Sequence, residues 1–140
     1  MRVLVVYSHP CEESFVAAVK DRLVSTLGDG GHEIRVLDLY AMGFDPVLSA
    51  QERRAYHTPV ENERAVADHL EALRWAEALV FVHPTWWYGP PAILKGWLDR
   101  VWVPFATFEM PRPGKPIGRV LTNIRVIGLV TTLGSPRWWW

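Results

Sequence analysis

Four short segments of mostly hydrophobic, often β-branched residues set the pattern of the chain. They occupy residues 3–7, 34–39, 79–82 and 126–131. Apolar runs of this length are typical of strands that are buried on both faces of a parallel sheet. The pattern therefore predicts four strands, of which the first is a central one.

Amphipathic helices are predicted between these strands. Ser14 stands at an N-cap position ahead of apolar residues spaced by four, and the glycines within residues 28–31 end that helix. Residues 58–61, Thr-Pro-Val-Glu, form a capping box with proline at the first helical position, which predicts a second long helix. We expect a short helix over residues 51–55 and a third long helix that starts at residues 90–91.

The order of these elements indicates the fold class. Alternating strands and helices are the signature of an open parallel α/β sheet with helices on both faces. We expect a single domain over residues 1–140, with a long proline-punctuated loop before the last strand. Ligands of such sheets bind beyond the carboxyl ends of the strands. The loops that leave the first, third and fourth strands are therefore the candidate site.

The first of these loops suits an anion. His9 and Ser14 lie at the entrance to a helix, where free N–H groups and the positive end of the dipole favour negative charge. The alternative is that Ser14 only caps its helix and that His9 packs locally. No Gly-x-Gly-x-x-Gly follows the first strand and no Gly-Lys-Ser/Thr occurs, so the known phosphate fingerprints do not decide between the two.

The second and third loops carry aromatic rings and hydroxyls. Trp86, Trp87 and Tyr88 are more large aromatics than packing at a strand end can use, and exposed rings are costly unless they meet a ligand or partner. A flat aromatic cofactor would stack on them. The alternative is that they pack beneath the loop or seal a dimer, and we expect one of the three to do so. Residues 131–134 offer small hydroxyls and backbone N–H groups for the polar edge of a ring system.

Composition and charge exclude several classes of protein. The 140 residues carry 15 Lys and Arg against 15 Asp and Glu, whereas a protein that binds nucleic acid through its phosphates usually has a basic excess. The single cysteine, Cys11, excludes an intramolecular disulfide and indicates a reducing compartment, the cytoplasm. The longest apolar runs have five residues, and a membrane span needs about 20.

Other site chemistries fit poorly. The five histidines show no ligand spacing, so no metal site is expected. No Gly-x-Ser-x-Gly elbow is present for a serine hydrolase. A response regulator needs carboxylates at the ends of the first and third strands, where this chain has Tyr7-Ser8-His9 and His83-Pro84.

One long segment resembles a family signature. Residues 84–101 read Pro-Thr-Trp-Trp-Tyr-Gly-Pro-Pro-Ala-Ile-Leu-Lys-Gly-Trp-Leu-Asp-Arg-Val. This run is similar to the Pro-x-x-Trp-aromatic-x-x-Pro-x-x-Leu-Lys-x-Trp signature of the flavodoxin-like NAD(P)H:quinone oxidoreductase family. Residues 8–15 and 38–46 also agree with that family, and the resemblance covers nearly the whole chain, to about residue 135.

The resemblance implies a flavodoxin-like fold, tightly bound FMN or FAD, and a homodimer with its active sites at the subunit interface. Two positions depart from the family, since Val16 stands where Asn is frequent and Leu133 replaces a usual Gly. The residues that the resemblance assigns to the flavin are His9, Ser14, Phe15, Val16, Pro84, Thr85, Trp86, Trp87, Tyr88, Thr131, Thr132, Leu133 and Gly134. The catalytic residues stay unassigned, because the family's tyrosine and histidine would lie beyond the last residue given.

The implied activity is a two-electron reduction. NAD(P)H would pass a hydride to the flavin, and a quinone or similar flat acceptor would be reduced in the same place, which requires no side-chain nucleophile. The alternative is a flavin-binding ancillary regulator of a potassium-efflux antiporter, with little turnover. An electron-carrier flavodoxin is disfavoured, because such carriers tend to be strongly acidic and this chain is neutral. FMN versus FAD, and NADH versus NADPH, stay open.

The helix after residue 91 is the expected site of dimerisation. Its apolar face is broader than one sheet surface can cover, so we expect part of it to meet a second subunit. The face comprises Ile93, Leu94, Trp97, Leu98, Val101 and Trp102.

The end of the chain carries a further expectation. A flavodoxin-like sheet normally has five strands, and the pattern shows four, so we expect the fifth strand and the last helix to be missing. The natural polypeptide is then longer. The alternative is that the three tryptophans at 138–140 fold over the last strand or swap into a neighbouring subunit.

Overall fold

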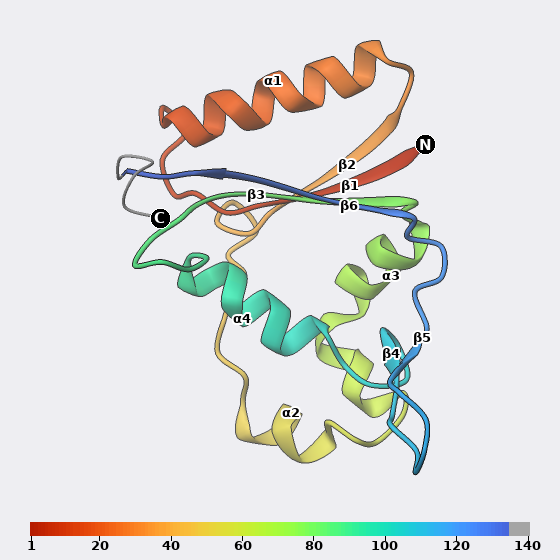
Figure 1. Cartoon of the computed structure of the whole chain (residues 1–140). Helices are drawn as coiled ribbons and strands as arrows, with labels where there is room; N and C mark the ends of the chain where they lie inside the picture. Colours follow the sequence, from red (N-terminus) through yellow and green to blue (C-terminus); the bar gives the residue numbers. More distant parts are fainter. Residues whose placement is uncertain (135–140) are drawn as a thin grey trace.

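The computed structural model describes residues 1–134 and shows one layer of four parallel strands between helices (Figure 1). The strands are β1 (Arg2–Tyr7), β2 (Glu33–Asp38), β3 (Ala78–Pro84) and β6 (Val126–Thr132). Their order across the sheet is β2-β1-β3-β6, and every neighbouring pair is parallel. The four predicted strands are confirmed, and β1 is a central one.

Helices cover both faces of this sheet. The long helices are α1 (Phe15–Asp29) on one face and α3 (Ala67–Trp75) and α4 (Ala92–Val101) on the other (Figure 1). α1 starts at the predicted cap, where the Ser14 hydroxyl accepts a hydrogen bond from the Ala17 N–H at 3.1 Å. The short α2 (Ala50–Ala55) is also confirmed. The described chain therefore has the flavodoxin-like open sheet that the sequence predicts.

The alternation of side chains along β1 divides the core into two halves. Val3, Val5 and Tyr7 pack with residues of α1, whereas Leu4 and Val6 pack with residues of α3 and α4. All five are buried, because β1 has a strand on each side and helices on both faces. An uninterrupted apolar run is what such a strand requires.

The capping box predicted at residues 58–61 is wrong. Val60 has a left-handed φ of 70°, and the chain continues as a 3₁₀ helix, η1 (Glu61–Val66), before α3 begins. The buried side chain of Asn62 gives a reason, because its Nδ2 donates to the carbonyl oxygens of Tyr56 at 3.0 Å and Pro104 at 2.9 Å. These hydrogen bonds satisfy carbonyl oxygens and anchor the segment to Pro104, but they cap no N–H groups.

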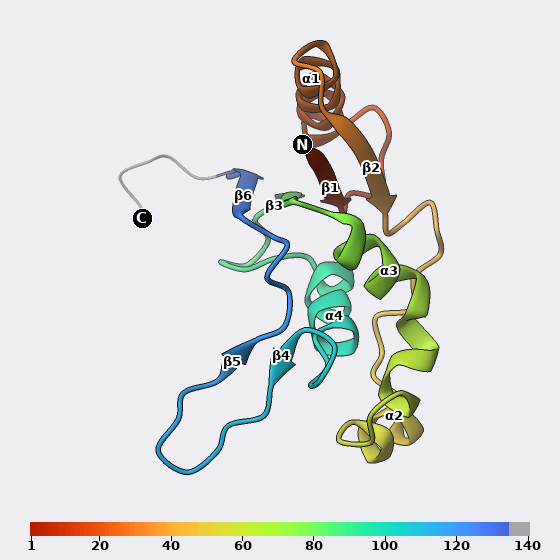
Figure 2. The same cartoon turned by 90° about the vertical axis from the view of Figure 1, so that its right-hand side faces the viewer.

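The proline-punctuated segment after α4 is more ordered than the predicted loop. β4 (Phe108–Glu109) and β5 (Gly118–Arg119) pair in antiparallel fashion and form an arm that projects away from the main sheet (Figure 2). Neither joins the main sheet, so β6 is an edge strand among residues 1–134, with Ile127 and Leu129 exposed. The expected fold-back of residues 138–140 lies outside the described residues.

The apolar face of α4 is covered within the chain itself. Ile93, Leu94, Trp97 and Val101 are buried, and Leu98 and Trp102 are partly buried against the same core. A dimer through α4 was expected because its apolar face is broader than one sheet surface can cover. In the structure, α3 and the neighbouring loops cover the rest of that face. A homodimer therefore stays a prediction that rests on the resemblance.

A buried histidine makes the stability of the fold dependent on pH. The Nδ1 of His69 on α3 accepts a hydrogen bond from the Trp97 indole N–H at 3.1 Å, and His69 is buried. Burial lowers the pKa of His69 below its ordinary value of 6.5, while Asp68 opposes this shift and Arg100 adds to it. The folded state therefore binds fewer protons at this site than the unfolded state does.

We expect the free energy of unfolding to decrease as the pH falls below about 6.5, the value of an unfolded histidine. The contribution of His69 is fully present above that pH, and it is lost as the pH falls through the lower pKa of the folded state. Urea unfolding at a series of pH values measures the slope. His69→Asn, whose amide oxygen can accept from Trp97, should flatten it. An unchanged slope would assign the effect to other groups.

Candidate functional site

Three loops that are far apart in the sequence meet at the carboxyl edge of the sheet. The Thr85 N–H donates to the Thr132 carbonyl at 2.8 Å, and the hydroxyls of Thr85 and Thr131 lie 2.7 Å apart. These contacts join the loop after β3 to the end of β6. The centroids of the His9 and Trp86 rings are 5.7 Å apart, which joins the loop after β1 to the loop after β3. The structure therefore brings the three candidate loops together.

The loop after β3 forms a tight turn with two aromatic residues at its tip. Trp86 and Gly89 exchange two backbone hydrogen bonds, at 3.0 and 3.1 Å. Trp87 and Tyr88 between them have φ values of 49° and 62°. Positive φ at both central positions is typical of a type I′ turn, which usually takes Asn or Gly there. Strained backbone of this kind clusters at ligand sites.

All three rings of this aromatic turn (residues 86–89) are exposed. The exposed fraction is 42% for Trp86, 96% for Trp87 and 68% for Tyr88. None of them packs beneath the loop, because the turn carries their backbone beyond the edge of the sheet (Figure 1). The other alternative, that one of the rings seals a dimer, stays a prediction. A row of exposed rings is an apolar surface that a planar ligand can cover.

Substitutions of Trp87 test the strain in the aromatic turn. Trp87→Gly and Trp87→Ala both remove the exposed ring, but only glycine relieves the left-handed backbone. We expect Trp87→Gly to be more stable than Trp87→Ala by about 1 kcal/mol. Urea unfolding of the two variants measures the difference. Equal stabilities would mean that the turn holds no strain at this position.

The loop after β1 presents the N-terminus of α1 to the same edge. The first N–H groups of a helix have no intrahelical acceptor, and the Ser14 hydroxyl takes only that of Ala17. Ser8 is fully buried, and its hydroxyl has no hydrogen-bond partner among the described residues. Glu12 and Glu13, which would repel a phosphate, are exposed. Free N–H groups beside an orphaned buried hydroxyl fit the phosphate end of a flavin nucleotide.

The residues that the resemblance assigns to the flavin fall into two groups. Those with exposed or partly exposed side chains, on the three loops and the adjoining ends of α1 and β6, are His9, Ser14, Phe15, Thr85, Trp86, Trp87, Tyr88, Thr131, Thr132, Leu133 and Gly134. Val16 and Pro84 are buried instead. The Val16 side chain packs in the core with Val3 and Val5, so only its backbone can face a ligand.

An apolar cavity that the sequence did not indicate adjoins the aromatic turn. It has a volume of about 380 Å³ and lies between the turn, α4 and β6. Leu94, Leu98 and Leu129 line it, together with the Thr85 and Thr131 side chains that join the two loops. Its walls extend the apolar surface of the turn toward the sheet. Only the apolar spacing along α4 could have signalled it.

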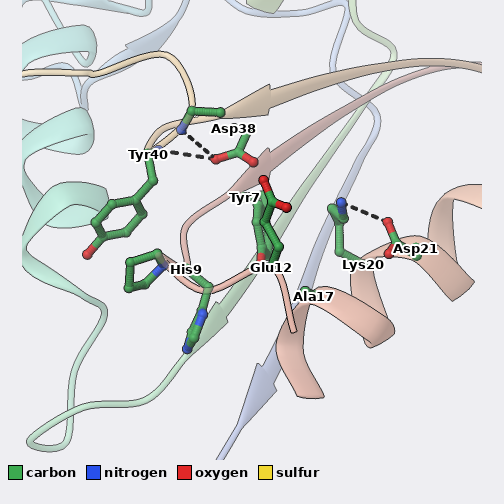
Figure 3. A pocket seen from close by; sticks show the side chains of 10 residues that line it. Tyr7, His9, Glu12, Ala17, Lys20, Asp21, Asp38 and Tyr40 are labelled. Atoms are coloured by element: carbon green, nitrogen blue, oxygen red, sulfur yellow. Dashed lines mark hydrogen bonds and ion pairs between the residues drawn. The ribbon is translucent and has the colours of Figure 1, made fainter. Parts of the chain in front are cut away.

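A second cavity, which we call the β1–β2 cavity, has a volume of about 600 Å³ (Figure 3). The ends of β1 and β2 and the first turns of α1 form its walls, with Tyr7, Lys20 and Asp38 among the lining residues. Burial raises the pKa of Tyr7, and the nearby Ser14 hydroxyl offsets this only in part. The hydrogen bond to Asp21 raises the pKa of Lys20. The cavity therefore holds a neutral phenol beside an ammonium group.

Two kinds of site are not found within residues 1–134. No three His, Cys, Asp or Glu side chains in that part of the chain lie together as metal ligands. None of its helices combines the length and the apolar character needed to cross a membrane.

Comparison with known proteins places the chain among flavodoxin-like proteins. Residues 1–139 match the sequence profile of a family described as having a flavodoxin-like fold. The ribosyldihydronicotinamide dehydrogenase (quinone) of Pongo abelii is 32% identical over 126 residues, which are 79% of this chain and 54% of that protein. The chain thus spans about half the length of this curated relative.

Solved structures show the same similarity in three dimensions. Smu.1420 from Streptococcus mutans UA159 is 34% identical with a TM-score of 0.82, and the match covers 99% of this chain and 71% of that chain. The NAD(P)H:quinone oxidoreductase from Methanothermobacter marburgensis is 29% identical with a TM-score of 0.85, and the match covers 98% and 68% of the two chains.

Proposed function

The chain belongs to the family with the flavodoxin-like fold, and we propose that it is a flavin-dependent oxidoreductase that moves a hydride from NAD(P)H to a quinone or similar flat acceptor. The observation that carries this proposal is the contact of the exposed aromatic turn with His9, which lies in the loop that leads to the open N-terminus of α1. The turn suits a planar ring system, and the helix end suits a phosphate joined to it.

The names of the relatives support the same activity. One is a dehydrogenase that is named for quinone and for a dihydronicotinamide riboside, and another is an NAD(P)H:quinone oxidoreductase. Both names point to a reduced nicotinamide as donor and a quinone as acceptor. Neither favours the regulator of an antiporter.

The side chains of the three loops would divide the binding of the flavin, FMN or FAD. Trp86 and Trp87 would pack on the ring system, and residues 131–134 would hydrogen-bond its polar edge. His9 and Ser14 would hold the phosphate or the linker beside it. A bound flavin supplies the hydride chemistry, so the protein has to bind, orient and exclude water rather than provide a nucleophile.

Absorbance spectra of the purified chain test this proposal. We expect flavin bands, either as purified or after FMN or FAD is added, and loss of those bands when NADH or NADPH is added without oxygen. A quinone should restore them. A chain that takes up neither flavin would overturn the proposal. So would a bound flavin that neither nicotinamide reduces.

A double variant locates the flavin on the aromatic turn. Removing both rings, in Trp86→Ala with Trp87→Ala, should weaken flavin binding by about tenfold or more, because each stacked ring contributes roughly 0.5–1.5 kcal/mol beyond its buried area. Ile117→Ala is the control, because Ile117 is also an exposed apolar residue but lies next to β5 on the arm. Equal losses in the two variants would place the flavin elsewhere.

We further propose that the protein is a cytoplasmic homodimer. The dimer follows from the resemblance, and the compartment follows from a chain with one cysteine, Cys11. Sedimentation of the flavin-bound chain at micromolar concentration measures the first, and a monomer would overturn it. Fractionation of cells measures the second.

A further inference from the structure

The apolar cavity between the aromatic turn, α4 and β6 differs in chemistry from the other cavity at the carboxyl edge. Among the described residues that line it, none is Asp, Glu, Lys or Arg, and three are the leucines Leu94, Leu98 and Leu129. The β1–β2 cavity, by contrast, has Asp21 and Asp38 among its lining residues. Cavities that bind small molecules commonly hold about 300–1,000 Å³, so an uncharged cavity of about 380 Å³ suits an apolar group.

The two ends of this cavity differ in polarity. The end at the carboxyl edge of the sheet carries the hydroxyls of Thr85 and Thr131, which lie 2.7 Å apart. Phe81 lies on β3 four residues before Thr85, and Leu129 lies on β6 two residues before Thr131, so these apolar side chains line the cavity farther from that edge. Four residues of a strand span about 13 Å. The cavity therefore runs from a polar end to an apolar end.

The polar end is continuous with the aromatic turn. Tyr88 and Gly89 belong to the turn, Pro90 follows it, and all three line the cavity. His83 lines it as well, and its buried ring is held in place because its Nδ1–H donates to the Pro84 carbonyl at 2.8 Å. A flat molecule bound at the turn can therefore extend a substituent directly into the cavity.

We propose that this cavity binds the apolar tail of a quinone whose ring is reduced at the aromatic turn. The choice of a quinone rests on the proposed function, which supplies a flat acceptor but not the groups on its ring. Burial of the tail stabilises the complex in proportion to the apolar area removed from water. An ionised substituent is disfavoured, because none of the described residues that line the cavity carries a charge to pair with it.

A matched series of quinones tests the inference. A benzoquinone without a tail is compared with the same ring carrying one or two isoprene units, with the flavin-loaded chain as enzyme and NADH or NADPH as donor. We expect each added unit to lower KM by about tenfold, because burial of each CH₂ group is favourable. We expect kcat to stay unchanged, since a tail away from the reacting ring binds the ground state and the transition state alike.

Binding of the tail alone is a second measurement, which needs neither flavin nor turnover. Geraniol, an alcohol of two isoprene units, is titrated into the purified chain and followed by the methyl NMR signals of its leucines. We expect the signals of Leu94, Leu98 and Leu129 to shift with one common dissociation constant. The signals of Leu23 and Leu27 should stay in place, because these residues pack on the opposite face of the sheet with α1.

The variant Leu129→Asp should remove both effects. Leu129 is 63% exposed on an edge strand, so a carboxylate is tolerated in the folded chain, yet it puts a charge where the tail would lie. Ile127→Asp is the matched control, because Ile127 is 68% exposed on the same face of β6 but is not among the residues that line the cavity. It should keep the tail preference and the geraniol affinity of the parent chain.

The outcomes separate this inference from the proposed function. Geraniol binding that Leu129→Asp weakens and Ile127→Asp does not supports the cavity as the tail site, even where no flavin binds and the proposed function fails. Equal KM values for the tailed and tail-less quinones overturn the inference, even where both are reduced. Geraniol binding that both variants weaken equally overturns it too. So does a dimer that Leu129→Asp dissociates in a chain without tail preference, because a second copy would then cover the cavity.

Discussion

Gly96→Ala should strongly destabilise the folded chain. Gly96 lies in the middle of α4, where a Cβ would collide with the carbonyl oxygen of Pro46 and come within 2.5 Å of its Cα. Both are backbone atoms, so the helix and the loop after β2 would have to separate. Overpacking costs typically about 1–3 kcal/mol, and more where backbone moves, out of a total stability of about 5–15 kcal/mol. We expect a loss above about 3 kcal/mol, measured by urea unfolding.

Gly28→Ala is the matched control for this variant. Gly28 also lies in a helix, α1, but the nearest atom to a Cβ there would be the Cδ1 of Ile34 at 4.0 Å. Alanine favours a helix more than glycine does, so this variant should match the parent chain or gain up to about 1 kcal/mol. A Gly96→Ala chain as stable as the Gly28→Ala chain would show that α4 and the loop do not approach this closely.

The contact of Gly96 with Pro46 gives a physical meaning to the family resemblance. Residues 38–46 and 84–101 are two of the stretches on which the resemblance rests, and here they touch. The small residue in α4 lets the loop after β2 lie directly against the helix. α4 in turn begins right after the aromatic turn, so the close packing fixes the helix whose first residues follow the site.

The fold was predictable because its signals are local. An apolar run marks each strand of the main sheet, and the Ser14 cap marks the start of α1. The capping box at residues 58–61 was an equally clear local signal, yet it is overridden. The Asn62 side chain bonds to the Pro104 carbonyl, 42 residues along the chain, and no local pattern carries that information.

The candidate site was predictable only in part. The meeting of the three loops was predictable, because the carboxyl ends of parallel strands lie at one edge of the sheet. The structure brings the loops together there. The type I′ geometry of residues 86–89 was not predictable, since Trp and Tyr are unusual at its central positions. The β1–β2 cavity was also missed, because Tyr7, Lys20 and Asp38 come from three separate elements. The position of Asp38 at a strand end was the one signal for it.

Trp97→Ala should destabilise the chain by about 3–5 kcal/mol, the usual cost of removing a buried tryptophan. Trp97 on α4 is fully buried, and its ring centroid lies 6.0 Å from that of Phe81 on β3 and 6.3 Å from that of His69 on α3. One side chain thus joins the sheet to two helices. Urea unfolding measures the loss of stability. The variant Trp97→Phe separates the contribution of the buried ring from that of the hydrogen bond to His69. Phenylalanine keeps an aromatic ring but leaves the Nδ1 of His69 without its donor, which should cost about 1–3 kcal/mol.

Trp87→Ala is the control from the same signature, ten positions earlier in the sequence. Because Trp87 is 96% exposed, its removal should change the free energy of unfolding by no more than about 0.5 kcal/mol. The same variant should weaken flavin binding, whereas Trp97→Phe should bind flavin as the parent chain does once it is folded. The two tryptophans would then separate the part of the signature that builds the core from the part that meets the ligand. Equal destabilisation by Trp97→Ala and Trp87→Ala would contradict that division.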